Sequence, residues 1–277
     1  MDLSYGQAAE AFRAEVRAFL ASHWPPAADL RGAELKAFIR DFRARATDAG
    51  YLYRAIPKIY GGSQQPVDVI KAQVIREEFA RARAPAEIGG NGMNMTVPTL
   101  LEKGTDEQKE LFIRKTVAGD YVWGQGYSEP GSGSDLASVR TKGELSADGS
   151  KWIINGQKIW TSQGMQSTHM FMLVRTEPDA PKHDGITYLL IDLDQPGITR
   201  RPIRQMTGEG GDHTFCEFFF DNAETPVGWQ VGERGQGWYV SRTTLKHERA
   251  SIGSADGLGR QFAKLIELAK DVGRIDE

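Results

Sequence analysis

The hydrophobic periodicity of this chain changes near Tyr121, and this change constrains the fold more than any other feature. Before it, apolar residues recur at helical spacing, so that Phe12, Val16 and Leu20 share one face of the segment AEAFRAEVRAFLASHW. After it, runs such as HMFMLVRTE, GITYLLIDL and TFCEFFF are typical of strands. A run of helices followed by a run of strands predicts an α+β protein.

Further helical segments are expected before Tyr121, with the sequences ELKAFIRDFRARATDAG, PVDVIKAQVIREEFARAR and TDEQKELFIRKTVAG. Gly50 follows the first of them and suits the left-handed position that closes a helix. Thr105 and Gln108 have the spacing of a capping box at the start of the third. We therefore expect residues 1–120 to form an N-terminal helical domain.

Residues 121–230 are expected to form a domain of antiparallel strands, as a small barrel or a sandwich. The dipeptides Asp148-Gly149 and Asn155-Gly156 are strong signals for two-residue hairpin turns. After VGERGQGW the helical periodicity returns. Residues 231–277 are accordingly predicted to be the first part of a C-terminal helical domain.

Composition argues against several classes of protein. The 34 Lys and Arg residues nearly balance 37 Asp and Glu, and the net charge of -3 at pH 7 indicates no nucleic-acid partner. No apolar run approaches the roughly 20 residues of a membrane span, and MDLSYGQAAEAF lacks the basic and apolar regions of a secretory signal. Cys216 is the one cysteine, and the five histidines lack metal-ligand spacing. We expect a cytoplasmic protein without a metal.

Familiar catalytic motifs are also missing from the sequence. There is no Walker loop and no G-x-S-x-G nucleophile elbow. The glycines of TGEGGD, residues 207–212, precede the strand-like TFCEFFF, whereas a dinucleotide fingerprint follows a strand and opens a helix. We interpret TGEGGD as a hairpin loop.

Two segments have a composition suited to ligand binding. The Gly-rich and Ser-rich run GYSEPGSGSDLAS, residues 126–138, would let a ligand approach the backbone closely, although its composition alone favours a surface loop. In KIWTSQG, residues 158–164, a Trp beside two hydroxyls suits an aromatic ligand with a polar edge. An ordinary core Trp explains the second segment equally well.

The order of these segments resembles the acyl-CoA dehydrogenase family. A helical region leads to YSEPGSGSD, then to WIINGQKIWTS, and then to PVGWQVGERGQGW and a helix containing LKHERA. The resemblance implies an N-terminal helical domain, a middle antiparallel β-barrel and a C-terminal helical bundle. It also implies FAD, an acyl-CoA substrate and α,β-dehydrogenation, with the α-proton passing to a glutamate and a hydride to flavin N5.

Carried over to this sequence, the resemblance implies cofactor contacts in both segments. Tyr127 and Ser128 would meet the pyrimidine edge of the flavin, Trp160 would pack on the isoalloxazine, and Ser162 would reach the N5 region. The family usually has Ile and then Thr after this Trp, so the hydroxyl is kept at Ser162. The implied cofactor-binding residues are Tyr127, Ser128, Gly133, Ser134, Trp160, Thr161 and Ser162.

The resemblance also implies a base and a substrate site. Glu248 of LKHERA matches the position of the catalytic glutamate in isovaleryl-type and long-chain-type members, and Arg249 matches a residue that positions the CoA moiety. Ser134 and Lys246 are further implied substrate contacts. Two alternatives stay open: Glu248 is a structural partner of a neighbouring cation, or the base lies in a C-terminal segment beyond residue 277.

Family members carry a further helical bundle after this point, so the chain is expected to be a fragment or to be completed by a partner. The implied partners are an electron-transfer flavoprotein or similar acceptor and further subunits of a homo- or hetero-oligomer. Two rival functions remain: a flavin monooxygenase or oxidase on the same scaffold, and an inactive subunit that completes a catalytic partner.

Overall fold

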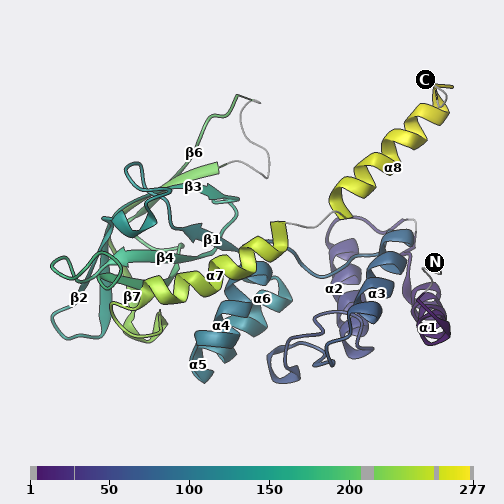
Figure 1. The fold of residues 1–277 in the computed structure, drawn as a ribbon, viewed down its shortest axis with the longest axis horizontal. Coiled ribbons are helices and arrows are strands. Elements are labelled where there is room, and N and C mark those ends of the chain that lie inside the picture. Colours follow the sequence, from purple (N-terminus) through teal and green to yellow (C-terminus); the bar gives the residue numbers. More distant parts are fainter. Residues whose placement is uncertain (1–4, 28, 207–214, 253–255, 275–277) are drawn as a thin grey trace.

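The computed structural model describes residues 5–27, 29–206, 215–252 and 256–274, and it confirms the α+β fold class (Figure 1). Helices precede the sheet in sequence and two helices follow it. The α-helices are α1 Gln7–His23, α2 Gly32–Asp48, α3 Val69–Arg81, α4 Val97–Lys103, α5 Asp106–Gln108, α6 Arg114–Ala118, α7 Gly237–Ile252 and α8 Asp256–Asp271. The strands are β1 Trp123–Gly126, β2 Lys142–Leu145, β3 Lys151–Ser162, β4 His169–Arg175, β5 Ile186–Asp192, β6 Ile198–Pro202, β7 Phe215–Pro226 and β8 Gln230–Val231.

The helix ends predicted from the sequence are present in the N-terminal region. Gly50 follows α2 with a φ of 82°, the left-handed conformation expected for a closing glycine. Thr105 and Gln108 form the reciprocal hydrogen bonds of a capping box at the start of α5. One π-helical turn, Gly92–Thr96, joins directly to α4, and another, Lys109–Ile113, joins α5 to α6.

A buried carboxylate joins α1 to α3. The side chain of Glu78 on α3 is 2% exposed and accepts hydrogen bonds from Arg13 and Arg17 of α1 and from Arg81 one turn along α3. Burial alone would raise the pKa of Glu78, but the three guanidinium groups outweigh it and lower the pKa to about 2. The helices are thus held together by charge as well as by apolar packing.

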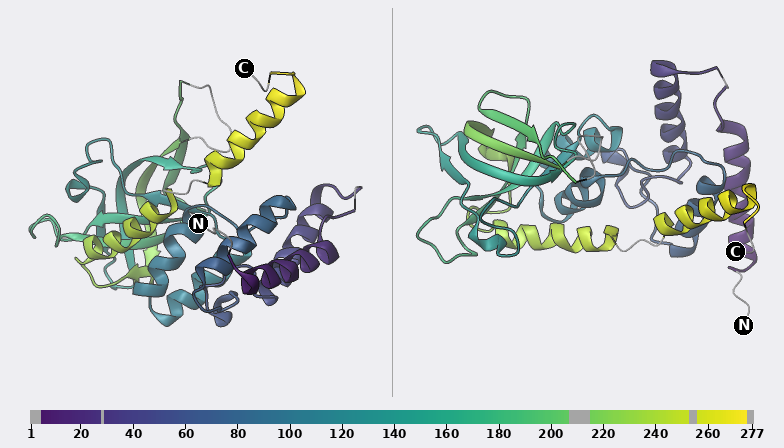
Figure 2. Two further views of the ribbon diagram at one scale, coloured as in Figure 1. Left: turned by 45° about the vertical axis from the view of Figure 1, so that its right-hand side comes forward. Right: turned by 90° about the horizontal axis from the view of Figure 1, so that it is seen from above.

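The eight strands form one sheet in the order β6-β7-β3-β2-β4-β5-β8, with β1 beside β4. Neighbouring strands are antiparallel except where β1 and β2 pair with β4. The strand order does not close on itself, so the structure does not confirm the predicted barrel. Figure 1 shows α7 running alongside the sheet and toward the N-terminal helices, and Figure 2 shows α8 standing apart from the sheet.

One of the two predicted hairpins is confirmed. Asp148-Gly149 forms the turn between β2 and β3, with Gly149 at a φ of 71°. The prediction for Asn155-Gly156 is wrong, because both residues lie inside β3, at an irregularity in its pairing with β7. A Cβ on Gly156 would lie 2.7 Å from the Thr141 backbone, so close packing explains this glycine. The loop predicted at 207–212 lies outside the described residues.

Candidate functional site

The two ligand-binding segments of the sequence meet in the structure. The Ile159 N–H donates to the carbonyl of Ser128 at 2.9 Å. The Thr161 hydroxyl donates to the carbonyl of Gln125 on β1 at 3.0 Å. The end of β3 therefore lies against β1 and the Gly-rich segment that follows it, as a shared site requires.

A buried ion pair joins the same two segments. Lys158 is fully buried, and its Nζ lies 2.8 Å from Glu129 Oε1, on a side chain that is 8% exposed, and 3.2 Å from the carbonyl of Tyr127. Glu129 also accepts the backbone N–H groups of Arg140 and Thr141. Burial lowers the pKa of Lys158 to about 8, which leaves the ammonium charged at neutral pH. Burial alone would raise the pKa of Glu129, but Lys158 and these donors lower it.

Trp160 is presented on the surface by an irregular strand. The pairing of β3 with β7 shifts register between Lys158 and Thr161, which is the signature of a bulge. Trp160 has a φ of 64°, a conformation that bulky residues rarely adopt, and it is 55% exposed. Its ring contacts Phe215 edge-on, with centroids 5.9 Å apart. Trp160 is therefore not a core residue, and strained backbone of this kind is common at ligand sites.

The Gly-rich segment is open enough to receive a cofactor. The residues Glu129 and Ser132 exchange backbone hydrogen bonds of 2.7 and 3.0 Å, which define a tight turn. A Cβ on Gly131 or Gly133 would meet nothing within 4 Å, and neither residue has a positive φ. Neither internal packing nor left-handed backbone therefore requires these glycines, whereas close approach of an external group would. These observations fit the binding of a large planar cofactor such as FAD.

The predicted cofactor contacts differ in accessibility. Trp160, Ser134 and Ser162 are exposed and Ser128 is half-buried. The side chain of Tyr127 is buried and packs edge-on against Phe171 and Tyr188. Thr161 is fully buried, and its hydroxyl is used on Gln125. Tyr127 and Thr161 can therefore contribute backbone groups to a ligand, while their side chains support the protein interior.

Helix α7 brings the predicted base to β1. The Gln125 side chain donates to Glu248 Oε2 in a long hydrogen bond of 3.4 Å. Because Gln125 also accepts the bond from Thr161, one residue connects Glu248 to the strand that carries Trp160. The structure thus places Glu248 beside the junction of the two segments.

The remaining predicted substrate contacts lie on α7. Lys246 Nζ pairs with Glu102 Oε1 of α4 at 2.7 Å, and His247 Nε2 lies 2.7 Å from the same oxygen. Arg249 is exposed. Glu248 faces Gln125 while its neighbour His247 faces α4, so α7 is held on both sides.

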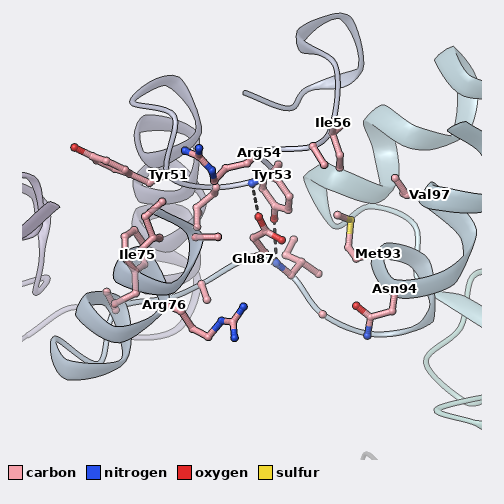
Figure 3. Close-up of a pocket in the computed structure, with 18 of the residues that line it drawn as sticks. Tyr51, Tyr53, Arg54, Ile56, Ile75, Arg76, Glu87, Met93, Asn94 and Val97 are labelled. Carbon is pink, nitrogen blue, oxygen red and sulfur yellow. Dashed lines mark hydrogen bonds between the residues drawn. The ribbon is translucent and has the colours of Figure 1, made fainter. Parts of the chain in front are cut away.

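A cavity of about 890 Å³ opens in the helical region beside this site (Figure 3). Its walls are mostly apolar and come from α3, from residues 51–56 and from residues 86–101. Gly90 follows Gly89 of the cavity wall, and a Cβ on Gly90 would lie 3.8 Å from Oε1 of Gln163, the residue after Ser162. Leu101 in its wall adjoins Glu102, which binds Lys246 and His247. The segments that form the cavity wall are thus continuous with residues that contact the end of β3 and α7.

Sequence reasoning missed three of the groups that build the site. Gln125, Glu129 and Lys158 lie in or next to the two segments, but nothing in their spacing shows that they interact. A charged residue within an otherwise strand-like run, as Lys158 is, was the available signal, because a buried charge requires a partner. The cavity had no sequence signal, because its walls come from separate segments.

Two negative findings apply to the parts of the chain that the structure describes. No group of three or more His, Cys, Asp or Glu side chains in those ranges is placed to hold a metal ion. None of the helices searched there combines the length and apolarity needed to cross a bilayer.

Two protein-family models match the helical region and the strand region of the chain separately. Residues 6–120 match the family model "Acyl-CoA dehydrogenase, N-terminal domain", and residues 124–223 match "Acyl-CoA dehydrogenase, middle domain". The chain is 40% identical over 284 residues to acyl-CoA dehydrogenase IpdE1 of Mycolicibacterium smegmatis, covering 96% of this chain and 71% of that protein.

Solved structures are similar over the same span. The Tcur3481-Tcur3483 steroid ACAD has a TM-score of 0.73 and 30% identity, covering 100% of this chain and 71% of that one. The ChsE4-ChsE5 complex from Mycobacterium tuberculosis has a TM-score of 0.64 and 31% identity, covering 89% of this chain and 61% of that one.

Proposed function

Because the chain belongs to the acyl-CoA dehydrogenase family, we propose that it binds FAD and uses Glu248 to dehydrogenate an acyl-CoA thioester between its α and β carbons. The observation that carries this proposal is the connection of Glu248 through Gln125 to the strand bearing Trp160. This connection supports a shared site for a carboxylate and an exposed aromatic surface.

Glu248 and Gln125 have separate roles in the proposed reaction. Glu248 accepts the α-proton of the substrate, and the bond from Gln125 holds its carboxylate in place. The α-proton of a thioester is weakly acidic, so its removal depends on a base that is held at a fixed position. FAD, when bound, supplies the acceptor for the hydride that leaves the β-carbon.

Trp160 and the open Gly-rich turn would hold the cofactor. The exposed indole offers a flat apolar face, and Ser128, Ser134 and Ser162 offer hydroxyl groups beside it. The buried Lys158–Glu129 pair keeps the two halves of this surface together. Arg249, which is exposed on α7, is proposed to meet the phosphates of the CoA moiety.

We further propose that the cavity beside the site receives the acyl group. Its volume of about 890 Å³ is within the range of pockets for drug-sized ligands, and far exceeds what a short linear acyl chain requires. A bulky acyl group agrees with the similarity to a steroid ACAD. The similarity to the ChsE4-ChsE5 complex supports assembly with a second, different chain, and we propose an electron-transfer flavoprotein or similar protein as the final acceptor.

The test is anaerobic reduction of bound flavin by acyl-CoA substrates of increasing bulk. We expect the protein, with its partner subunit if one exists, to purify yellow and to lose its visible flavin absorption on mixing. Absence of flavin binding, or no reduction by any acyl-CoA, contradicts the proposal. Rapid reoxidation by air, faster than transfer to a carrier protein, would favour the oxidase or monooxygenase alternative.

A further inference from the structure

The cavity described above contains one carboxylate that the proposed reaction does not use. Glu87 lies in the segment between α3 and α4, among apolar cavity residues such as Ile56, Met93 and Val97. In Figure 3, Ile75 and Arg76 lie to one side of it, and Met93, Asn94 and Val97 lie to the other. A carboxylate in such surroundings is costly unless it has hydrogen-bond partners.

The position of Glu87 is fixed by Tyr53, which lies beside it in the cavity wall. The Tyr53 N–H donates to Glu87 Oε1 at 2.5 Å, and the Tyr53 hydroxyl accepts the N–H of Ile88 at 3.0 Å (Figure 3). Tyr53 has a φ of 50°, a strained conformation for an aromatic residue. These two bonds hold the carboxylate at a fixed place in the cavity wall.

The second carboxylate oxygen is available to a ligand. Glu87 Oε2 has no hydrogen bond to any residue within the described ranges, and the residue is accessible through the open cavity. The surrounding protein nevertheless raises the pKa of Glu87, because it limits hydration of the charged form. A donor on a bound molecule would take the place of solvent at this oxygen.

Three arginines, Arg54, Arg76 and Arg83, line the cavity, and two of them have other interactions. Arg54 donates to the carbonyl of Gly50 at 2.6 Å and so faces the backbone of its own loop. Arg76, which lies on α3, has another interaction in the structure. Asn94 also lines the cavity. Glu87 is the carboxylate among these lining residues, and it can accept a hydrogen bond from a ligand that enters the apolar part of the cavity.

We propose that Glu87 selects acyl groups that carry a hydroxyl on their distal, apolar part. The hydroxyl donates to Glu87 Oε2 while the apolar body fills the cavity. This inference rests on the proposed function, and it adds a substrate class: bulky acyl-CoA thioesters hydroxylated far from the thioester. A site built to accept a hydrogen bond discriminates strongly against analogues that lack the donor.

The experiment compares matched ligands by calorimetry, so it does not depend on turnover. The pair is 3-cyclohexylpropanoyl-CoA and 3-(4-hydroxycyclohexyl)propanoyl-CoA, with butanoyl-CoA as a ligand too short to reach Glu87. The wild-type protein is expected to bind the hydroxylated compound roughly 10-fold or more tightly than its partner, since hydrogen bonds to charged groups have that strength. Glu87→Leu is expected to abolish this preference and leave butanoyl-CoA affinity within about 2-fold.

Glu87→Gln is the conservative control. Its amide oxygen retains the bond from Tyr53, and its NH2 group, at the position of Oε2, can only donate to the oxygen of the ligand hydroxyl. This neutral bond should give a preference between those of the wild-type and Leu proteins. Near-ultraviolet circular dichroism verifies that both variants are folded. Glu87→Gln preserves the Tyr53 contact. If only Glu87→Leu fails to fold, the comparison of Glu87→Gln with the wild-type protein still tests the proposal.

Three results overturn the inference. The first is a wild-type protein that binds both cyclohexyl compounds equally. The second is a preference that persists unchanged in both Glu87 variants. The third is a stronger preference for a 4-carboxycyclohexyl analogue, which would assign recognition to the arginines. If no acyl-CoA binds, butanoyl-CoA included, the proposed function fails as well, and this outcome is distinct from the other three.

Discussion

Replacing Lys158 with methionine removes one half of the ion pair that joins the two segments of the site. Glu129 would keep its bonds from the backbone of Arg140 and Thr141 but would lose the ammonium group 2.8 Å away. Breaking a buried pair from one side costs about 3–5 kcal/mol, because the remaining charge is buried without its partner. Because Glu129 keeps two hydrogen bonds, we expect a loss near the lower limit of this range, about 3 kcal/mol in the free energy of unfolding.

Urea denaturation followed by tryptophan fluorescence measures this loss, with ligand conditions identical for every variant. Lys151→Met is the matched control on the same strand, because Lys151 and Glu224 form a pair whose side chains are 50% and 47% exposed. We expect that control to lose less than about 1 kcal/mol. The double variant Glu129→Gln/Lys158→Met removes both charges but sets an amide NH2 against one of the two backbone N–H groups that Glu129 accepts, so it should recover only part of the loss. A Lys158→Met loss no larger than that of Lys151→Met would refute the role assigned to the buried pair.

Three further predictions concern cofactor binding and acid stability. Trp160→Ala should weaken FAD binding roughly 10-fold while unfolding at nearly the wild-type temperature, because the indole is largely exposed; unchanged affinity by fluorescence titration contradicts this. Gly133→Val should also weaken FAD binding without harming the fold, since its Cβ meets no protein atom within 4 Å; full retention of FAD would count against the open turn as a cofactor surface. The depressed pKa of Glu78 should contribute about 2–3 kcal/mol to the free energy of unfolding at pH values above 4.5, the ordinary pKa of this group, and progressively less as the pH falls toward about 2. A Glu78→Gln variant that retains the wild-type acid dependence of stability would be inconsistent with this.

The sequence predicted the elements that depend on local patterns. The helical face of α1, the glycine after α2 and the capping box at Thr105 each arise within a few residues, and the structure confirms all three. The change from helices to strands near Tyr121 was visible for the same reason. Resemblance to the family then indicated which residues have functional roles.

Features that depend on long-range pairing were not predictable. Asn155-Gly156 has the composition of a hairpin turn, but continued pairing with β7 keeps it inside β3. The exposure of Trp160 results from an irregularity in that same pairing. Lys158 and Glu129 are separated by 29 residues, and only the folded sheet brings them together. Closure of the sheet into a barrel likewise depends on contacts between distant strands.

The rate of anaerobic flavin reduction by acyl-CoA in Glu248→Gln tests most directly whether Glu248 removes the α-proton. The variant keeps the size of the side chain and should retain FAD and acyl-CoA binding. Loss of a general base should slow reduction roughly 100-fold to 10,000-fold, whereas Glu144→Gln, at an exposed position on β2, should reduce normally. Reduction of the Glu248→Gln protein at the wild-type rate would contradict the claim and place the base elsewhere.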